Sequence, residues 1–171
     1  MPRLLPALLF FVLGSLAPAN AQDWVEYKGP GYRAEFPSAP RVQVQDVPTS
    51  AGVRHMGNAN FETETDGVLL SFITVHPERP NVWTGGDPQV TLDRTLQLAV
   101  SASRGRLREE KRLILDGQPA RRSVIDMPKQ QVCVLLQVMR GDQLYQAIAV
   151  VSAGHEDTAQ RFINSFALLP L

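Results

Sequence analysis

The sequence contains a single cysteine, Cys133, among its 171 residues. One cysteine excludes a disulfide bond within the chain, so the packing of apolar side chains has to stabilise the fold. Acidic and basic residues are equally frequent, 17 of each. The chain therefore lacks the basic excess that nucleic-acid binding requires, and its composition gives no sign of a basic helix for a membrane surface.

Cys133 lies in the apolar run Val132 to Leu136, and no histidine is near it in the sequence. A reactive thiol or a bridge to another chain is one interpretation. A small buried apolar side chain is the other, and it is favoured because free cysteines are among the most buried residues.

Several motifs of catalysis and ligand binding are also missing. His55, His76 and His155 each stand alone in their segments, and no pair of histidines or cysteines has zinc-site spacing. The Gly-x-Ser-x-Gly elbow of serine hydrolases and the lysine-serine ending of a phosphate loop do not occur. We assign no catalytic residue, metal or cofactor. Two alternatives stay open, namely a metal held by scattered ligands and a hydrolase site built from converging acids: Glu62, Glu64, Asp66, Glu109, Glu110 and Asp126.

The first 21 residues have the pattern of a cleavable signal peptide. Arg3 precedes an apolar run from Leu4 to Leu16, and Ala19-Asn20-Ala21 offers small residues for cleavage after Ala21. The run is shorter than the about 20 residues that span a bilayer. We therefore expect a periplasmic or secreted protein with one domain, 22–171, a formal charge of −1 and no integral membrane segment.

Alternation of apolar and polar residues predicts strands along most of the remaining chain. The hairpin turns that join them carry glycine, as in Asp66-Gly67 and Asp116-Gly117. A loop is expected at 48–52. The predicted strands are 24–27, 32–36, 41–47, 53–63, 68–75, 106–115, 118–127, 130–139 and 143–152.

Two segments have the apolar spacing of helices. The first begins after the capping pair Asp87-Pro88 and is expected to end at Gly105. The second covers 154–165, and a short edge strand is expected after it at 166–169. Cys133 and Leu135 make the second face of their strand half apolar, which predicts that a helix covers it. The order of elements predicts an α+β fold with two main helices on a large, mostly antiparallel sheet.

The segment Gly31-Tyr32-Arg33-Ala34-Glu35-Phe36-Pro37-Ser38-Ala39-Pro40 resembles the opening of PsbP-like domains and of secreted bacterial proteins similar to them. Gly117 to Arg121, Tyr145 and Phe162 to Phe166 resemble later parts of that family in the same order. The resemblance covers the chain after the leader and implies an α/β/α sandwich. It further implies a non-enzymatic accessory module, because photosynthetic members dock on a membrane complex and assist its ion cofactors. No docking or ion-binding residue of the family can be carried over to this chain.

Two segments are candidate partner-binding surfaces. Arg106 and Arg108 share one face of a predicted strand and could join Arg121-Arg122 into a basic patch. The alternative pairs them with Glu109, Glu110 and Asp126 on a solvated face.

The second candidate is the loop 76–87, where His76, Arg79 and Trp83 offer an aromatic and basic contact surface. In the alternative interpretation Trp83 covers the edge of the core.

The sequence thus favours an exported binding or accessory module for an envelope protein or complex. A hydrolase that uses converging carboxylates or His76 is one alternative. A carrier of a small ligand, held in an apolar cleft between a helix and the sheet, is another.

Overall fold

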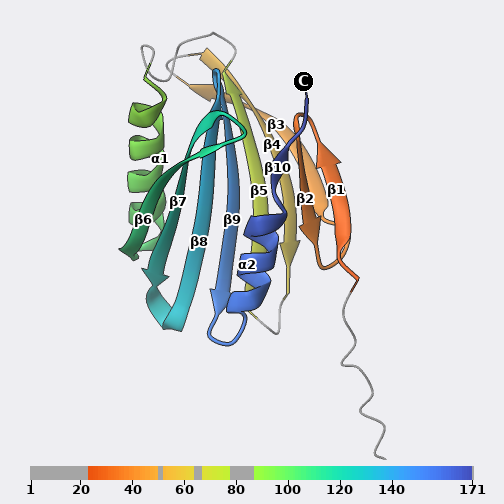
Figure 1. Cartoon of the computed structure of the whole chain (residues 1–171), viewed down its shortest axis with the longest axis vertical. Coiled ribbons are helices and arrows are strands. Elements are labelled where there is room, and N and C mark those ends of the chain that lie inside the picture. Colours follow the sequence, from red (N-terminus) through yellow and green to blue (C-terminus); the bar gives the residue numbers. More distant parts are fainter. Residues whose placement is uncertain (1–22, 50–51, 64–66, 78–86, 171) are drawn as a thin grey trace, which may run out of the picture.

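The computed structural model describes residues 23–49, 52–63, 67–77 and 87–170. A seven-stranded antiparallel sheet forms its centre, with the strand order β3-β4-β5-β9-β8-β7-β6 (Figure 1). Its strands are β3 (Arg41–Thr49), β4 (Gly52–Glu62), β5 (Val68–Pro77), β6 (Arg106–Leu115), β7 (Gln118–Met127), β8 (Gln131–Arg140) and β9 (Gln143–Ser152). The expected α+β class and large antiparallel sheet are confirmed.

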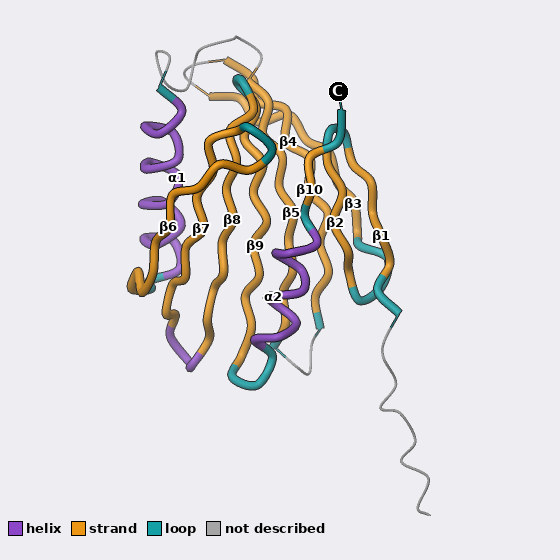
Figure 2. The backbone as a smooth tube through the Cα atoms, viewed as in Figure 1, coloured by secondary structure: helices purple, strands orange, loops and turns teal. Residues whose placement is uncertain are grey.

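A second, three-stranded sheet packs in front of the large one and has the order β1-β2-β10 (Figure 2). It consists of β1 (Val25–Gly29), β2 (Tyr32–Phe36) and β10 (Ala167–Leu168). The alternation of residues predicted these strands but gave no sign that they form a separate sheet.

The helices α1 (Pro88–Ser103) and α2 (Glu156–Ser165) cover opposite faces of the large sheet (Figure 1). Strand β8 shows why both faces need a cover. Val134 packs in the core that contains Phe162 of α2, whereas Cys133 and Leu135 pack with Leu96 of α1. Successive side chains of a strand point to opposite faces, so an apolar run such as this one becomes buried on both sides. The helix cover that was expected over Cys133 is α1.

Aromatic rings join the layers on the α2 side. Tyr32 of β2 stacks on Phe72 of β5 with ring centres 3.8 Å apart, and Phe72 lies 5.1 Å from Phe166 at the end of α2. Phe36 lies 5.0 Å from Phe162. These contacts hold the small sheet and α2 against the large sheet, because buried aromatic rings contribute a large apolar area.

Helix α1 begins as predicted, because Asp87 caps it by accepting a hydrogen bond of 2.8 Å from the backbone N–H of Gln89. Its end differs by one residue from the prediction. Arg104, with φ 52°, takes the left-handed position, and Gly105 follows it. Glycine at position 105 leaves room for the neighbouring strand β7. A Cβ there would lie 2.5 Å from Cγ2 of Ile125 and 2.7 Å from the carbonyl oxygen of Asp126.

Two other boundaries correct the sequence-based predictions. Pro48 and Thr49 belong to β3 rather than to a loop, which is possible because β3 is an edge strand and needs no donor on its outer side. His76 belongs to β5 rather than to the following loop. No helix in the described ranges is both long and apolar enough to cross a membrane.

Gly105→Ala should lower the free energy of unfolding by about 1–3 kcal/mol, because the added Cβ overlaps β7. Arg104→Gly is the control and should leave stability unchanged or raise it, since glycine adopts a positive φ without strain. Urea denaturation of both variants and the wild type measures the difference. Equal stability of Gly105→Ala and the wild type would contradict the close approach.

Candidate functional site

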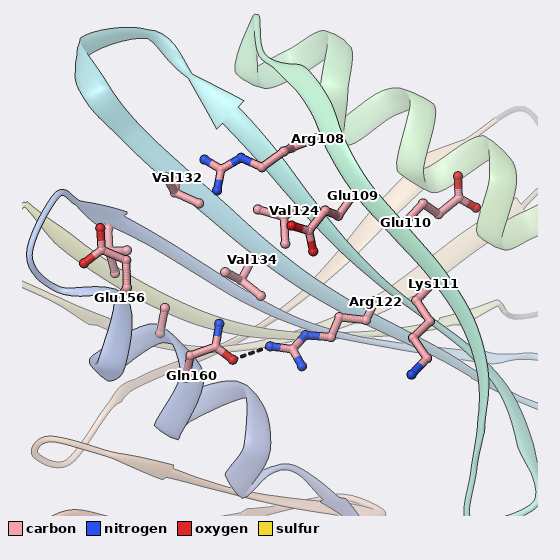
Figure 3. Close-up of a pocket in the computed structure, with 12 residues that line it drawn as sticks. Arg108, Glu109, Glu110, Lys111, Arg122, Val124, Val132, Val134, Glu156 and Gln160 are labelled. Atoms are coloured by element: carbon pink, nitrogen blue, oxygen red, sulfur yellow. Dashed lines mark hydrogen bonds between the residues drawn. The ribbon is translucent and has the colours of Figure 1, made fainter.

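A cleft of about 590 Å³ lies on the α2 side of the large sheet, between α2 and the β6–β7 hairpin (Figure 3). Valines form its floor and charged or polar side chains its rim. The floor residues are Val124, Val132, Val134, Val151 and Ala159, and the rim includes Arg108, Glu109, Lys111, Arg122, Glu156 and Gln160.

The cleft forms because α2 and the small sheet cover only part of this face of the large sheet. Helix α2 packs on β9 and β8 and on β2 of the small sheet. Strands β7 and β6 lie beyond these contacts, and Val124 and Val132 remain only partly buried. The register of β6 against β7 shifts between Leu107 and Glu109, which makes a bulge at Arg108. Bulges bend a strand and increase its twist, which aims the side chains that follow toward the cleft.

The charged residues of the rim form two groups that follow each other along β6. We call them the basic level, with Lys111 and Arg122, and the acidic level, with Glu109 and Glu156. Lys111 of β6 lies opposite Arg122 of β7, and Arg122 donates a hydrogen bond to Gln160 of α2 (Figure 3). Glu109 lies opposite Val124, two residues along β6, and Glu156 lies one helical turn before Gln160. Two residues of a strand span about 7 Å, so a basic level and an acidic level follow each other at this distance.

Arg106 and Arg108 both lie close to the carboxylate of Asp126. Arg108 pairs with Asp126, and Nη2 of Arg106 lies 3.8 Å from Oδ2 of the same carboxylate. The hydrogen bond from Arg108 lowers the pKa of Asp126 and, reciprocally, raises the pKa of the guanidinium. The pairing with Asp126 that sequence analysis offered as the alternative is thus present.

Arg121 does not join these arginines in a patch, so this part of the basic-patch interpretation is wrong. Its side chain is 1% exposed and faces α1, where it pairs with Asp93 and, over 3.3 Å, with Glu110. Neighbouring residues of one strand point to opposite faces, so only Arg122 can share the cleft with Arg108. A buried arginine requires such acidic partners, because an unpaired charge in the interior is strongly destabilising.

His76 lies in a different pocket, of about 260 Å³, between the β1–β2 turn and strands β3 to β5. It stands directly opposite His55 in the β4–β5 pair, and Nδ1 of His55 lies 2.7 Å from Oδ1 of Asp46. Sequence reasoning treated these histidines as isolated, although the hairpin register could have paired them. Arg79 and Trp83 lie outside the described residues. In the described ranges, no three His, Cys, Asp or Glu side chains form a group that could hold a metal.

Cys133 is buried at 5% exposure under α1, and burial raises the pKa of its thiol to about 11. A thiol with a raised pKa is a poor nucleophile at neutral pH. The structure therefore agrees with the interpretation as a small buried side chain.

The fold defines the class of protein: an α/β/α domain with a second small sheet and an open cleft on one face. Among solved structures it is similar to that of cyanobacterial PsbP (CyanoP) from Synechocystis sp. PCC 6803. The TM-score is 0.55 at 16% sequence identity, over 92% of this chain and 99% of that chain. The chain thus has a PsbP-like fold, as the sequence resemblance implied.

A protein of unknown function from Pseudomonas aeruginosa gives a TM-score of 0.40 at 10% identity, over 86% of this chain and 97% of that chain. No sequence profile of a known family matches the chain, and no curated protein sequence matches it significantly.

His76 should make the fold sensitive to acid. Burial, and secondly the nearby His55, lowers the pKa of His76 below its ordinary 6.5. Below about pH 6.5 His76 binds a proton more readily in the unfolded state than in the folded state. The free energy of unfolding therefore falls as the pH decreases. His76→Gln should reduce this fall between about pH 7.5 and pH 5 in urea denaturation. His155→Gln, at the start of α2, is the control; an equal effect of both variants would contradict the prediction.

Proposed function

We propose that the protein is a non-catalytic accessory domain that binds a segment of another protein in the cleft between α2 and the β6–β7 hairpin. The observation that carries this proposal is the open cleft itself, in whose floor Val124 and Val132 are only partly buried. Elsewhere on the same face, α2 and the small sheet bury the apolar side chains of the large sheet. A concave site with an apolar floor and a few polar groups at its rim is typical of a binding site.

The rim favours an extended polypeptide segment as the occupant. Lys111 and Arg122 make no ion pair with any described residue, and Glu109 and Glu156 make none either. A segment that places an acidic and a basic group about 7 Å apart could pair with both levels while its apolar side chains cover the valines.

An accessory role in the envelope rests on two further supports. Residues 1–21 have the pattern of a signal peptide, so the partner would be a periplasmic or secreted protein, or the exposed part of an envelope complex. The PsbP-like fold is the second support, by analogy with a family of accessory modules. The contribution of Arg79 and Trp83 to partner binding stays a prediction.

A carrier of a small ligand is the second candidate, because about 590 Å³ lies within the range of small-molecule pockets and the cleft separates a helix from the sheet. The hydrolase alternative gains less support. His76 lines a different pocket from Glu109 and Glu110, so the histidine does not join these acids in one site.

Export predicts a specific processed chain. When the full sequence is expressed in a bacterial host with an intact secretion pathway, the periplasmic or culture fraction should contain protein that starts at Gln22. Mass spectrometry of the intact protein measures the terminus. Ala21→Leu should block processing, because the peptidase requires a small residue, whereas Gln22→Ser should not. Uncleaved wild-type protein in the cytoplasm would contradict export.

If the partner binds in the cleft, exchanging charges at the rim should weaken its binding. The double variant Glu109→Lys, Lys111→Glu keeps the net charge but exchanges the two charges that β6 contributes to the rim, and we expect it to capture about tenfold less partner from envelope extracts. Lys129→Glu combined with Asp142→Lys makes the same exchange in two turns outside the cleft and should capture the wild-type amount.

Identical capture by the wild type and the rim variant would contradict the cleft as the site of partner binding. A small molecule seen in native mass spectra of the wild type and lost from the rim variant, with no protein captured, would favour the carrier instead.

A further inference from the structure

The seven-stranded sheet has two edges, β3 and β6, and β3 is the less protected of the two. In the part of the chain that the structure describes, no strand pairs with the outer side of either. An open edge offers unpaired backbone donors and acceptors to another strand, and proteins usually block it with charges or bulges.

Strand β6 carries both forms of protection. It has the bulge at Arg108, and six of its ten residues, in the sequence RLREEKRLIL, are charged. Strand β3 has no bulge and fewer charges, and its one proline, Pro48, lies outside residues 41–45. Its nine residues, RVQVQDVPT, pair with β4 without a register shift and include only two charges, Arg41 and Asp46. Val42 is 49% exposed and Val44 is 78% exposed.

We propose that β3 pairs antiparallel with β3 of a second copy of this chain, which joins two seven-stranded sheets into one. The pairing is centred on Gln43. Residues that face each other across an antiparallel pair lie on the same side of the sheet, so a two-fold axis through Gln43 keeps each face of one sheet continuous with the same face of the other.

This register matches the polarity of every facing pair between Arg41 and Gln45. Val42 faces Val44 of the second copy, and the symmetry repeats that pair on the other side of the axis. Gln43 faces Gln43, and Arg41 faces Gln45, so no like charges oppose each other. Strand β3 can therefore pair with an identical strand, because cross-strand pairs of matching polarity stabilise a sheet.

The proposed interface leaves the cleft accessible. Strand β3 is at the opposite end of the strand order from β6 and β7, which form one wall of the cleft. A dimer would therefore present two open clefts, and a partner with two binding segments would gain avidity. The proposal stands independently of what the cleft binds.

Sedimentation velocity over a range of protein concentrations tests the proposal. The wild type should show a dimer fraction that rises with concentration. Val44→Lys should weaken the dimer by about tenfold, because both symmetry-related Val42–Val44 pairs are lost. Ile114→Lys is the matched control: Ile114 is a 69% exposed apolar residue on the other edge strand, and its replacement should leave the dimer unchanged.

Cysteine cross-linking tests the register. The only native cysteine, Cys133, is buried, so Gln43→Cys provides the accessible thiol. Facing residues have Cα atoms about 4.5–5.5 Å apart, within the range that a disulfide spans. Under mild oxidation Gln43→Cys should form a disulfide-linked dimer. Gln45→Cys, two residues along the same face, should not, because it faces Arg41.

A wild type that is monomeric at every concentration would overturn the proposal, and so would equal weakening by Val44→Lys and Ile114→Lys. Equal cross-linking of Gln43→Cys and Gln45→Cys would overturn the register and with it the self-complementary pairing.

Discussion

Burial of both faces of β8 is the constraint on which the rest of the structure depends. Val134 and Val138 require an apolar cover on one side, and Cys133 and Leu135 require one on the other. The chain meets these needs with α2 and the small sheet on one face and with α1 on the opposite face. Without a disulfide bond, this burial and the aromatic contacts around Phe72 are the main stabilising interactions.

The candidate surfaces arise where that cover ends. Helix α2 reaches β8 but not β6, so the floor of the cleft stays partly exposed while charges gather at its rim. On the same sheet, the charges and bulge that shape the cleft wall also protect the β6 edge from pairing. Strand β3 lies at the far edge with only two charged residues and no bulge. One sheet therefore has two ends of different character, one suited to binding a charged segment and one suited to pairing with a strand.

Local patterns allowed much of the fold to be predicted. The alternation in 118–127 and 143–152 and the capping pair Asp87-Pro88 each specify an element through contacts between residues near in sequence. The cleft could not be predicted, because it depends on how far α2 extends over the sheet. Glu156 and Gln160 are 47 and 49 positions after Glu109 and Lys111, so only packing brings them together.

The sequence by itself determined the class of fold, the strand and helix order and the burial of Cys133, since hydrophobic periodicity acts over a few residues. Only the tertiary structure decided that β1, β2 and β10 form a separate sheet, that Arg121 and Arg122 face opposite layers, and that His55 lies opposite His76. The physical reason is that strand register and the packing of layers depend on residues far apart in the chain, whose positions no local pattern specifies.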